Sequence, residues 1–168
     1  QSAKMRPDKV FRANVISDGD PLEIYTSRDG EVIFKKYSLM GGLDDFAAQL
    51  CETMSRSTGA ICAVTDRDSV IAVAGGAKRE LLGKRITAEL EQIMEGRRIY
   101  QYAGDGKTIP VCDGNDKLTT AVAAPILAEG DLLGLVLFIS TEGAAATGDA
   151  EYKLAQTIAA FLGRHMES

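Results

Sequence analysis

Apolar and polar residues alternate with a period of two over residues 20–37, on both sides of the dipeptide Asp29-Gly30. This alternation predicts two short strands, and Asp-Gly is a strong hairpin signal because glycine accepts the positive φ that a tight turn requires. Two strands alone are only marginally stable in water. We therefore expect this hairpin to pair with another part of the chain or with another subunit.

The rest of the chain switches between helical and strand-like periods. Apolar residues spaced three and four apart predict helices over residues 43–54, 78–96 and 147–165. Runs of β-branched and other apolar residues predict strands over residues 59–66, 69–76, 119–126 and 131–140. The stretch 97–117 is rich in glycine and charge around one strand-like run, 108–112, so we expect a long loop there.

This order of elements predicts an α+β domain over residues 39–168, with a central antiparallel sheet flanked by helices. The apolar strand 131–140 should be central, and Pro125 should lie near an edge or a bulge because proline cannot donate a ladder hydrogen bond. The first and last helices should lie together on one face, where their exposed apolar positions would suit a contact between copies. The apolar stripe of the last helix is Leu154, Ile158, Phe161 and Leu162.

The composition limits the class of protein and its location in the cell. The 168 residues are 45% hydrophobic and 26% charged, which is ordinary for a globular protein able to bury a real core. The longest apolar run, 132–139, has strand length and falls far short of a membrane span. Basic residues interrupt the first sixteen positions, so no secretory signal is predicted. We expect a cytoplasmic protein without a membrane partner.

Charge is unevenly distributed along the chain. The net charge is -5, yet Lys4, Arg6, Lys9 and Arg12 face only one acid, Asp8, in the first twelve residues. Only this end of the chain could meet a phosphate backbone. A basic tip of this size is also typical of solvated surface, so charge alone leaves both interpretations open.

Candidate catalytic chemistry is sparse. The three cysteines are separated by 11 and 50 positions, and the single histidine, His165, lies near the end of the chain. These spacings fit neither a metal site nor a Cys-His or Ser-His pair. Gly75-Gly76 lacks the spacing of a phosphate loop, and Asp66 and Asp68 suit a turn better than an acid–base pair. No cofactor is predicted.

Two segments carry a family resemblance. The runs Gly19-Asp-Pro-Leu-Glu-Ile-Tyr25 and Arg28-Asp-Gly-Glu-Val-Ile-Phe-Lys-Lys-Tyr-Ser38 resemble the second half of the AbrB-type swapped-hairpin DNA-binding domain. The following region is similar to a GAF domain in element order, in Thr65-Asp-Arg-Asp68 and in the closing Ala159-Ala-Phe-Leu-Gly-Arg-His-Met166. The combination resembles the two-domain, sporulation-type transcription regulators of spore-forming bacteria.

The resemblance implies a swapped-hairpin module over residues 1–38 that dimerises and binds double-stranded DNA. Interleaved subunits would complete each other's sheet, and the DNA-binding residues would be Lys4, Arg6, Lys9 and Arg12. Family members begin with a further strand and a Leu-Gly-Arg-Val-Val-Ile-Pro-Lys-Glu-Ile-Arg-Arg segment, of which only Pro7, Val10 and Arg12 match here. We expect the native protein to begin upstream of Gln1.

The resemblance also implies a sensor or oligomerisation domain over residues 39–168. GAF domains resemble small-molecule sensors whose pocket lies between the sheet and a crossing segment. The predicted lining is Cys62, Val64, Val73, Ile109, Val111, Thr120 and Val122, with Tyr100 and Tyr102 as caps. Alternating valine and alanine on a sheet is also the pattern of ordinary core packing.

The preferred hypothesis is a transcription regulator that performs no chemistry. It would bind DNA as a homodimer or homotetramer and be modulated by an unknown small-molecule effector. The alternative is a GAF-like sensor or scaffold whose N-terminal hairpin only dimerises. A third hypothesis, an enzyme of the methionine-sulfoxide-reductase type, requires a reactive thiol.

Overall fold

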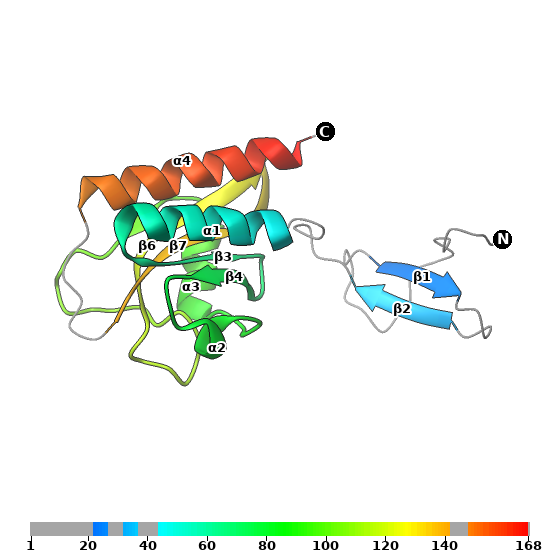
Figure 1. Ribbon diagram of the computed structural model, residues 1–168, viewed down its shortest axis with the longest axis horizontal. Coiled ribbons are helices and arrows are strands. Elements are labelled where there is room, and N and C mark those ends of the chain that lie inside the picture. The colour runs from blue at the N-terminus through cyan, green and yellow to red at the C-terminus, as the bar shows by residue number, and fades with distance from the viewer. Residues whose placement is uncertain (1–21, 27–31, 37–43, 142–147, 168) are drawn as a thin grey trace. The chain divides into compact units, whose positions relative to one another are not determined.

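The chain divides into two units, Gln1–Gly41 and Gly42–Ser168. The computed structural model describes residues 22–26, 32–36, 44–141 and 148–167 (Figure 1). In the first unit, β1 (Leu22–Thr26) pairs with β2 (Val32–Lys36) in an antiparallel hairpin. The predicted hairpin is confirmed, and its swapped arrangement stays a prediction.

The second unit is built on a five-stranded antiparallel sheet with the order β4-β3-β7-β6-β5. Its strands are β3 (Ile61–Thr65), β4 (Val70–Ala74), β5 (Tyr100–Gln101), β6 (Thr119–Ala128) and β7 (Asp131–Ser140). Both predicted hairpins are confirmed, and the apolar β7 is central. The short edge strand β5 was not predicted.

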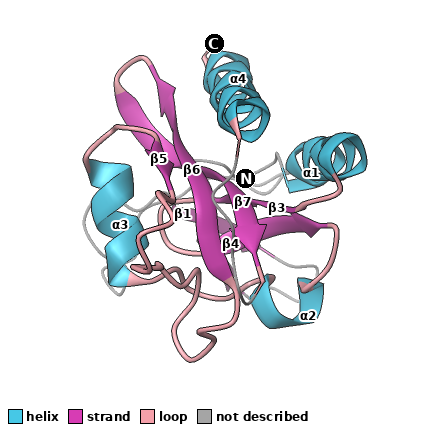
Figure 2. Ribbon diagram, turned by 90° about the vertical axis from the view of Figure 1, so that its left-hand side faces the viewer, coloured by secondary structure: helices cyan, strands magenta, loops and turns pink. Residues whose placement is uncertain are grey.

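In the described part of the second unit, two helices cover each face of the sheet. On one face lie α1 (Asp44–Thr58) and α4 (Asp149–Met166), and on the other lie α2 (Lys78–Leu81) and α3 (Ala88–Glu95) (Figure 2). The predicted placement of the first and last helices together is confirmed. Acidic residues begin α4 and basic residues end it, as the helix dipole favours. No helix among the described residues is long and apolar enough to cross a membrane.

The single helix predicted over residues 78–96 is wrong. After α2 the chain turns at Gly83, whose φ of 79° is left-handed, and then runs extended. The Val70 N–H donates to the Lys84 carbonyl at 2.9 Å, and the Gly83 N–H donates to the Val70 carbonyl at 2.9 Å. Pairing with the open edge of β4 therefore replaces a helical turn, and Thr87 starts α3 by accepting a hydrogen bond from the Leu90 N–H.

The stripe predicted for α4 is displaced by one position around the helix. Ala155, Ala159, Leu162 and Gly163 are the residues that α4 buries. Small residues let the helix approach the sheet closely, so the larger Phe161 is left 47% exposed. The first helix extends to Thr58, four residues beyond its predicted end, and Gly59 follows it with a φ of 75°.

Turn and bulge geometry completes the sheet. Glu129 and Gly130, with φ of 52° and 86°, form a two-residue turn that lengthens β6 to Ala128. A register shift follows Ile126, which places Pro125 beside a bulge as predicted. The run 108–112 forms only isolated bridges instead of a strand.

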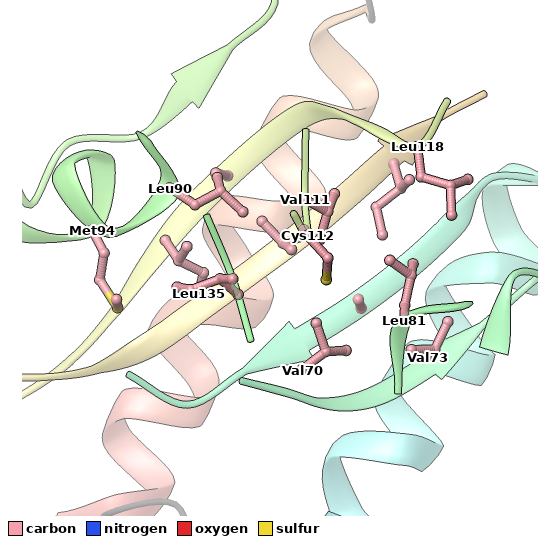
Figure 3. Packing of buried hydrophobic residues seen from close by; sticks show 14 of the residues in the cluster. Val70, Val73, Leu81, Leu90, Met94, Val111, Cys112, Leu118 and Leu135 are labelled. Carbon is pink, nitrogen blue, oxygen red and sulfur yellow. The ribbon is translucent and has the colours of Figure 1, made fainter. Parts of the chain in front are cut away.

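A core cluster of buried side chains lies on the α2/α3 side of the sheet. Leu81 of α2 and Leu90 and Met94 of α3 pack onto Val73 and Leu135 of the strands (Figure 3). Val111, Cys112 and Leu118 of the long loop close the cluster. The loop between β5 and β6, residues 102–118, which we call the crossing loop, is therefore anchored by buried side chains although it has little regular structure.

Candidate functional site

The residues predicted to contact DNA lie outside the described residues. They are Lys4, Arg6, Lys9 and Arg12. Their role stays a prediction, and the structure contributes only the hairpin that follows them.

The residues predicted to line a ligand site are divided between the two faces of the sheet. Ala63, a member of the α2/α3-side core, pairs with Val73, so Val73 lies on that face. Neighbours along a strand alternate, so Cys62 and Val64 lie on the α1/α4 face. Val122 pairs with Phe138 and shares that second face. These three residues are separated from the other predicted lining residues by the sheet itself.

A bulge separates Thr120 from Val122. Thr120 pairs with Ile139 and Val122 with Phe138, so one residue of β6 is inserted at this point. A regular strand would place Thr120 and Val122 on one face, which is what the sequence predicted. The bulge turns Thr120 to the α2/α3 face, where its partner Ile139 belongs to the core.

Thr120 carries the main polar feature of this face. Its Oγ1 is buried and has no hydrogen-bond partner, alone in this respect among the side chains of the described residues. Its backbone N–H is satisfied, donating to the Ile109 carbonyl at 2.8 Å. An unpaired buried hydroxyl costs about 1–3 kcal/mol, and a bound molecule could supply the missing partner.

Apolar side chains that are only partly buried adjoin this position. Ile61 pairs with Ile139, which in turn pairs with Thr120, so these three side chains form one row across the sheet. The partly buried apolar residues on this core are Ile61, Ala77, Ile93, Tyr100 and Ile109. The set has no ionisable member apart from the tyrosine, and it suits a small, uncharged and mostly apolar molecule.

The two predicted caps have different roles. Tyr102 is 7% exposed, and its hydroxyl accepts a hydrogen bond from the Gly106 N–H at 3.0 Å. It therefore holds the crossing loop in place. Tyr100 is half-buried and pairs with Ala123 at the sheet edge. Burial, with Asp105 and Tyr102 nearby, raises the pKa of Tyr100, so its hydroxyl stays a neutral donor.

Thr87 links the helix on this side to the crossing loop, a role that the sequence did not reveal. Its hydroxyl donates to the Pro110 carbonyl at 2.9 Å, and its N–H donates to the Val111 carbonyl at 3.1 Å. The Val111 N–H in turn donates to the Leu118 carbonyl at 3.1 Å. The signal available in the sequence was a threonine before an apolar helical run, which the assumed continuous helix obscured.

The thiols of the domain are poor nucleophiles. Burial, with a smaller contribution from Cys62, raises the pKa of Cys51 to about 12. Burial also raises the pKa of Cys62 to about 12 and that of Cys112 in the same direction. A thiol needs its thiolate to react, so all three are suppressed at neutral pH. Among the described residues, no group of three His, Cys, Asp or Glu side chains could hold a metal ion.

Comparison with known proteins adds family information. Residues 42–167 match the family model described as "Stage V sporulation protein T C-terminal, transcription factor". The chain is 38% identical over 162 residues to stage V sporulation protein T of Bacillus subtilis (strain 168). That match covers 96% of this chain and 89% of the relative.

Two solved structures share the fold of the second unit. The cofactor binding GAF domain of the nutrient sensor CodY from Clostridium difficile gives a TM-score of 0.53 at 13% identity, covering 71% of this chain and 83% of that one. A GAF domain/HD domain protein from Geobacter sulfurreducens gives 0.52 at 18% identity, covering 76% and 97%. At these identities the likeness concerns the fold alone, and it confirms the GAF-like fold predicted from the sequence.

Proposed function

The chain belongs to the stage V sporulation protein T family of transcription factors, and we propose that it binds double-stranded DNA through its N-terminal module while its GAF domain senses a small molecule. The family supports a transcription regulator with a GAF domain. We propose the contact with DNA, the binding of a ligand, and the conformational coupling between these two sites.

The hairpin supports a dimeric DNA-binding module. The described β1 and β2 pair only with each other, and two strands are marginally stable alone. A second copy would supply the missing strands and double the cationic surface of residues 1–12. Opposed charges on DNA and this surface then favour binding through counterion release. The assembly would be a homodimer or a homotetramer.

The DNA proposal is tested by the salt dependence of binding in a chain with the native N-terminus. Replacing Lys9 and Arg12 by alanine should weaken binding. The negative slope of log affinity against log salt concentration should become shallower by about 0.9 for each phosphate that is no longer neutralised. Lys153→Ala, in α4, removes one positive charge from an exposed helical site and should leave the slope unchanged. Undetectable binding at low salt would instead favour a dimerising scaffold.

The unpaired Thr120 hydroxyl carries the ligand proposal. A small, uncharged molecule with an apolar body and one hydrogen-bonding group would satisfy this hydroxyl and cover the partly buried apolar side chains beside it. Tyr100 would contribute a second hydrogen bond from the sheet edge. Val73 and Val111, both in the adjoining core, would shape the floor.

A small alcohol can test this site before the natural effector is known. We propose titrating 3-methylbutan-1-ol into the isotopically labelled chain and following backbone amide signals by NMR. Saturable shifts at Ile109 and Thr120 are expected, and Thr120→Val should abolish them. Val122→Thr, a matched change on the opposite face of β6, should leave them intact. Shifts spread over both faces, or none that saturate, would contradict the site.

Regulation would be conformational. A ligand can shift the DNA-binding assembly only by its different affinity for two arrangements of the protein. The crossing loop would carry that difference, because the Ile109 carbonyl accepts a hydrogen bond from Thr120 and the adjacent Pro110 carbonyl accepts one from Thr87, the N-cap of α3. The reductase hypothesis is not favoured because burial suppresses the three thiols.

A further inference from the structure

The segment 78–85, which contains α2, is the most concentrated run of positive charge in the second unit. Lys78, Arg79, Lys84 and Arg85 are all exposed, and Glu80 is the single acid among them, giving a formal charge of +3. No ion pair involves any of these four cations within the described residues. We call residues 78–85 the basic segment.

An exposed leucine lies within the basic segment. Leu82 is 41% exposed, whereas its neighbour Leu81 is fully buried in the core. Only Leu127 and Phe161 are comparable exposed large apolar residues in the described part of the chain. Protein interfaces commonly have an apolar centre surrounded by a polar rim. In the basic segment, Leu82 would be the apolar centre and the surrounding cations the rim.

The backbone holds the basic segment in place. Besides its two hydrogen bonds with Val70, the segment forms a bridge from Arg85 to Ser69, and the Ile86 N–H that follows donates to the Asp68 carbonyl at 3.0 Å. Leu81 inserts into the core from the other side. Ordering of this backbone is therefore already complete before any partner arrives, which lowers the entropic cost of docking.

The next helix along the chain, α3, has the opposite charge. Over its eight residues, α3 carries Glu89, Glu91 and Glu95 and no basic residue, giving a formal charge of −3. Glu89 and Glu95 are exposed. Leu90 of α3 and Leu81 of α2 pack in the same core, so both charged surfaces occupy one side of the sheet.

We propose that a second copy of this chain docks on this face, with the basic segment of each protomer against α3 of the other. Two patches of opposite sign on one side of the sheet are self-complementary about a two-fold axis, because each protomer offers what the other needs. DNA is disfavoured as the occupant because the carboxylates of α3 would repel its phosphates. A phosphate backbone would also offer no apolar surface against which the Leu82 side chain could be buried.

This contact would be separate from the two other self-contacts that the protein offers. The α1/α4 face lies on the opposite side of the sheet, and the hairpin belongs to the other unit. Exposed ion pairs contribute little individually. When copies are already joined through another surface, however, the effective concentration of one docking surface for another is high. A weak contact is then sufficient to enlarge the assembly.

Charge reversal tests the proposal in the full chain. The molar mass would be measured by sedimentation at low and high salt. K84E/R85E should halve the mass at low salt, and E89K/E95K should do the same. Combining the four changes inverts both surfaces and should restore the original mass. K107E/K117E makes an equal change of charge in the exposed part of the crossing loop and should have no effect.

The outcomes separate the possible occupants. Loss of mass in both reversals and recovery in the combination would establish docking between copies. An unchanged mass, or a loss that the combination does not restore, would overturn the proposal. Weaker DNA binding by K84E/R85E at constant mass would overturn it in favour of a phosphate contact. Circular dichroism should show a native fold throughout, because the changed side chains are exposed.

Discussion

Gly163 of α4 lies directly against the backbone carbonyl of Leu127 in β6, so close that a Cβ on the glycine would stand 2.0 Å from that oxygen. The carbonyl belongs to the strand backbone and cannot rotate away as a side chain could. The absence of a side chain at Gly163 therefore sets the distance between α4 and the sheet.

Gly163→Ala should destabilise the second unit. Alanine favours helix by about 1 kcal/mol over glycine, but here its methyl group would force α4 away from β6 and loosen the packing. We expect a net loss of about 1–3 kcal/mol in the free energy of unfolding, measured by urea denaturation.

Gly96→Ala is the matched control. Gly96 ends α3 with a φ of −70°. The atom nearest to a Cβ added at Gly96 would be the Ile93 carbonyl oxygen, at 3.4 Å. Alanine is compatible with that conformation and should leave stability unchanged or raise it slightly. Equal destabilisation by the two substitutions would show that contact with Leu127 is unimportant.

Two buried threonines on the sheet should respond differently to valine. The Thr65 hydroxyl accepts a hydrogen bond from the Leu135 N–H at 3.1 Å, so Thr65→Val leaves a buried donor unpaired and should cost about 1–3 kcal/mol. The Thr120 hydroxyl has no partner. Thr120→Val should therefore be neutral or stabilising in the ligand-free protein.

Thermal and urea unfolding of the two variants provide the comparison. Because the substitution is the same and both residues are buried, the difference reports the hydrogen bonding. A large loss for Thr120→Val would mean that its hydroxyl has a partner in the ligand-free protein, and the ligand proposal would lose its main support.

The sequence predicted the elements that depend on local periodicity. Alternation around Asp29-Gly30 identified the hairpin, and regular spacing from Phe46 to Met54 identified α1. These patterns are dictated by which residues face the core, and the same burial stabilises them in the folded protein.

The errors arose where distant segments override a local pattern. Ile86 continues the apparent helical stripe of 78–96, yet it forms a bridge with Cys112 of the crossing loop. Thr120 and Val122 follow strand alternation, yet the inserted residue between them turns Thr120 to the other face. Neither the edge pairing nor the bulge has a signature within a few residues, so the lining of the site could not be predicted correctly.

Alkaline pH should destabilise the domain through its cysteines. Burial raises the pKa of Cys51 and Cys62 from 9.0 in the unfolded chain to about 12 in the folded one. Below pH 9 both states hold the protons, and stability is unaffected. As pH rises from 9 towards 12, only the unfolded chain loses them, so the free energy of unfolding falls.

Chemical unfolding at several pH values would measure this effect. C51A/C62A should flatten the decline above pH 9, even though each alanine lowers stability at every pH by leaving a small cavity. Iodoacetamide should modify both cysteines only as the protein unfolds. Rapid modification of the native protein at pH 8 would contradict the suppressed reactivity and would renew the case for a thiol-based enzyme.

The exposed ring of Phe161 should support association through the α1/α4 face. Phe161 is 47% exposed, and its ring centre lies 5.8 Å from that of Phe46 and 6.3 Å from that of His165. Phe46 and His165 stack at 4.7 Å, so three rings from the start of α1 and the end of α4 form one cluster. Burying such a cluster against a second copy would remove apolar surface from water.

Phe161→Glu should therefore lower the molar mass of the full chain in sedimentation, while thermal stability changes little because the side chain is already half in water. Gln156→Glu, on an exposed position of the same helix, adds the same charge without removing a ring and should leave the mass unchanged. Combined with K84E/R85E, Phe161→Glu should lower the mass further than either change alone, since the two surfaces lie on opposite faces of the sheet. A mass unaffected by Phe161→Glu would place association elsewhere.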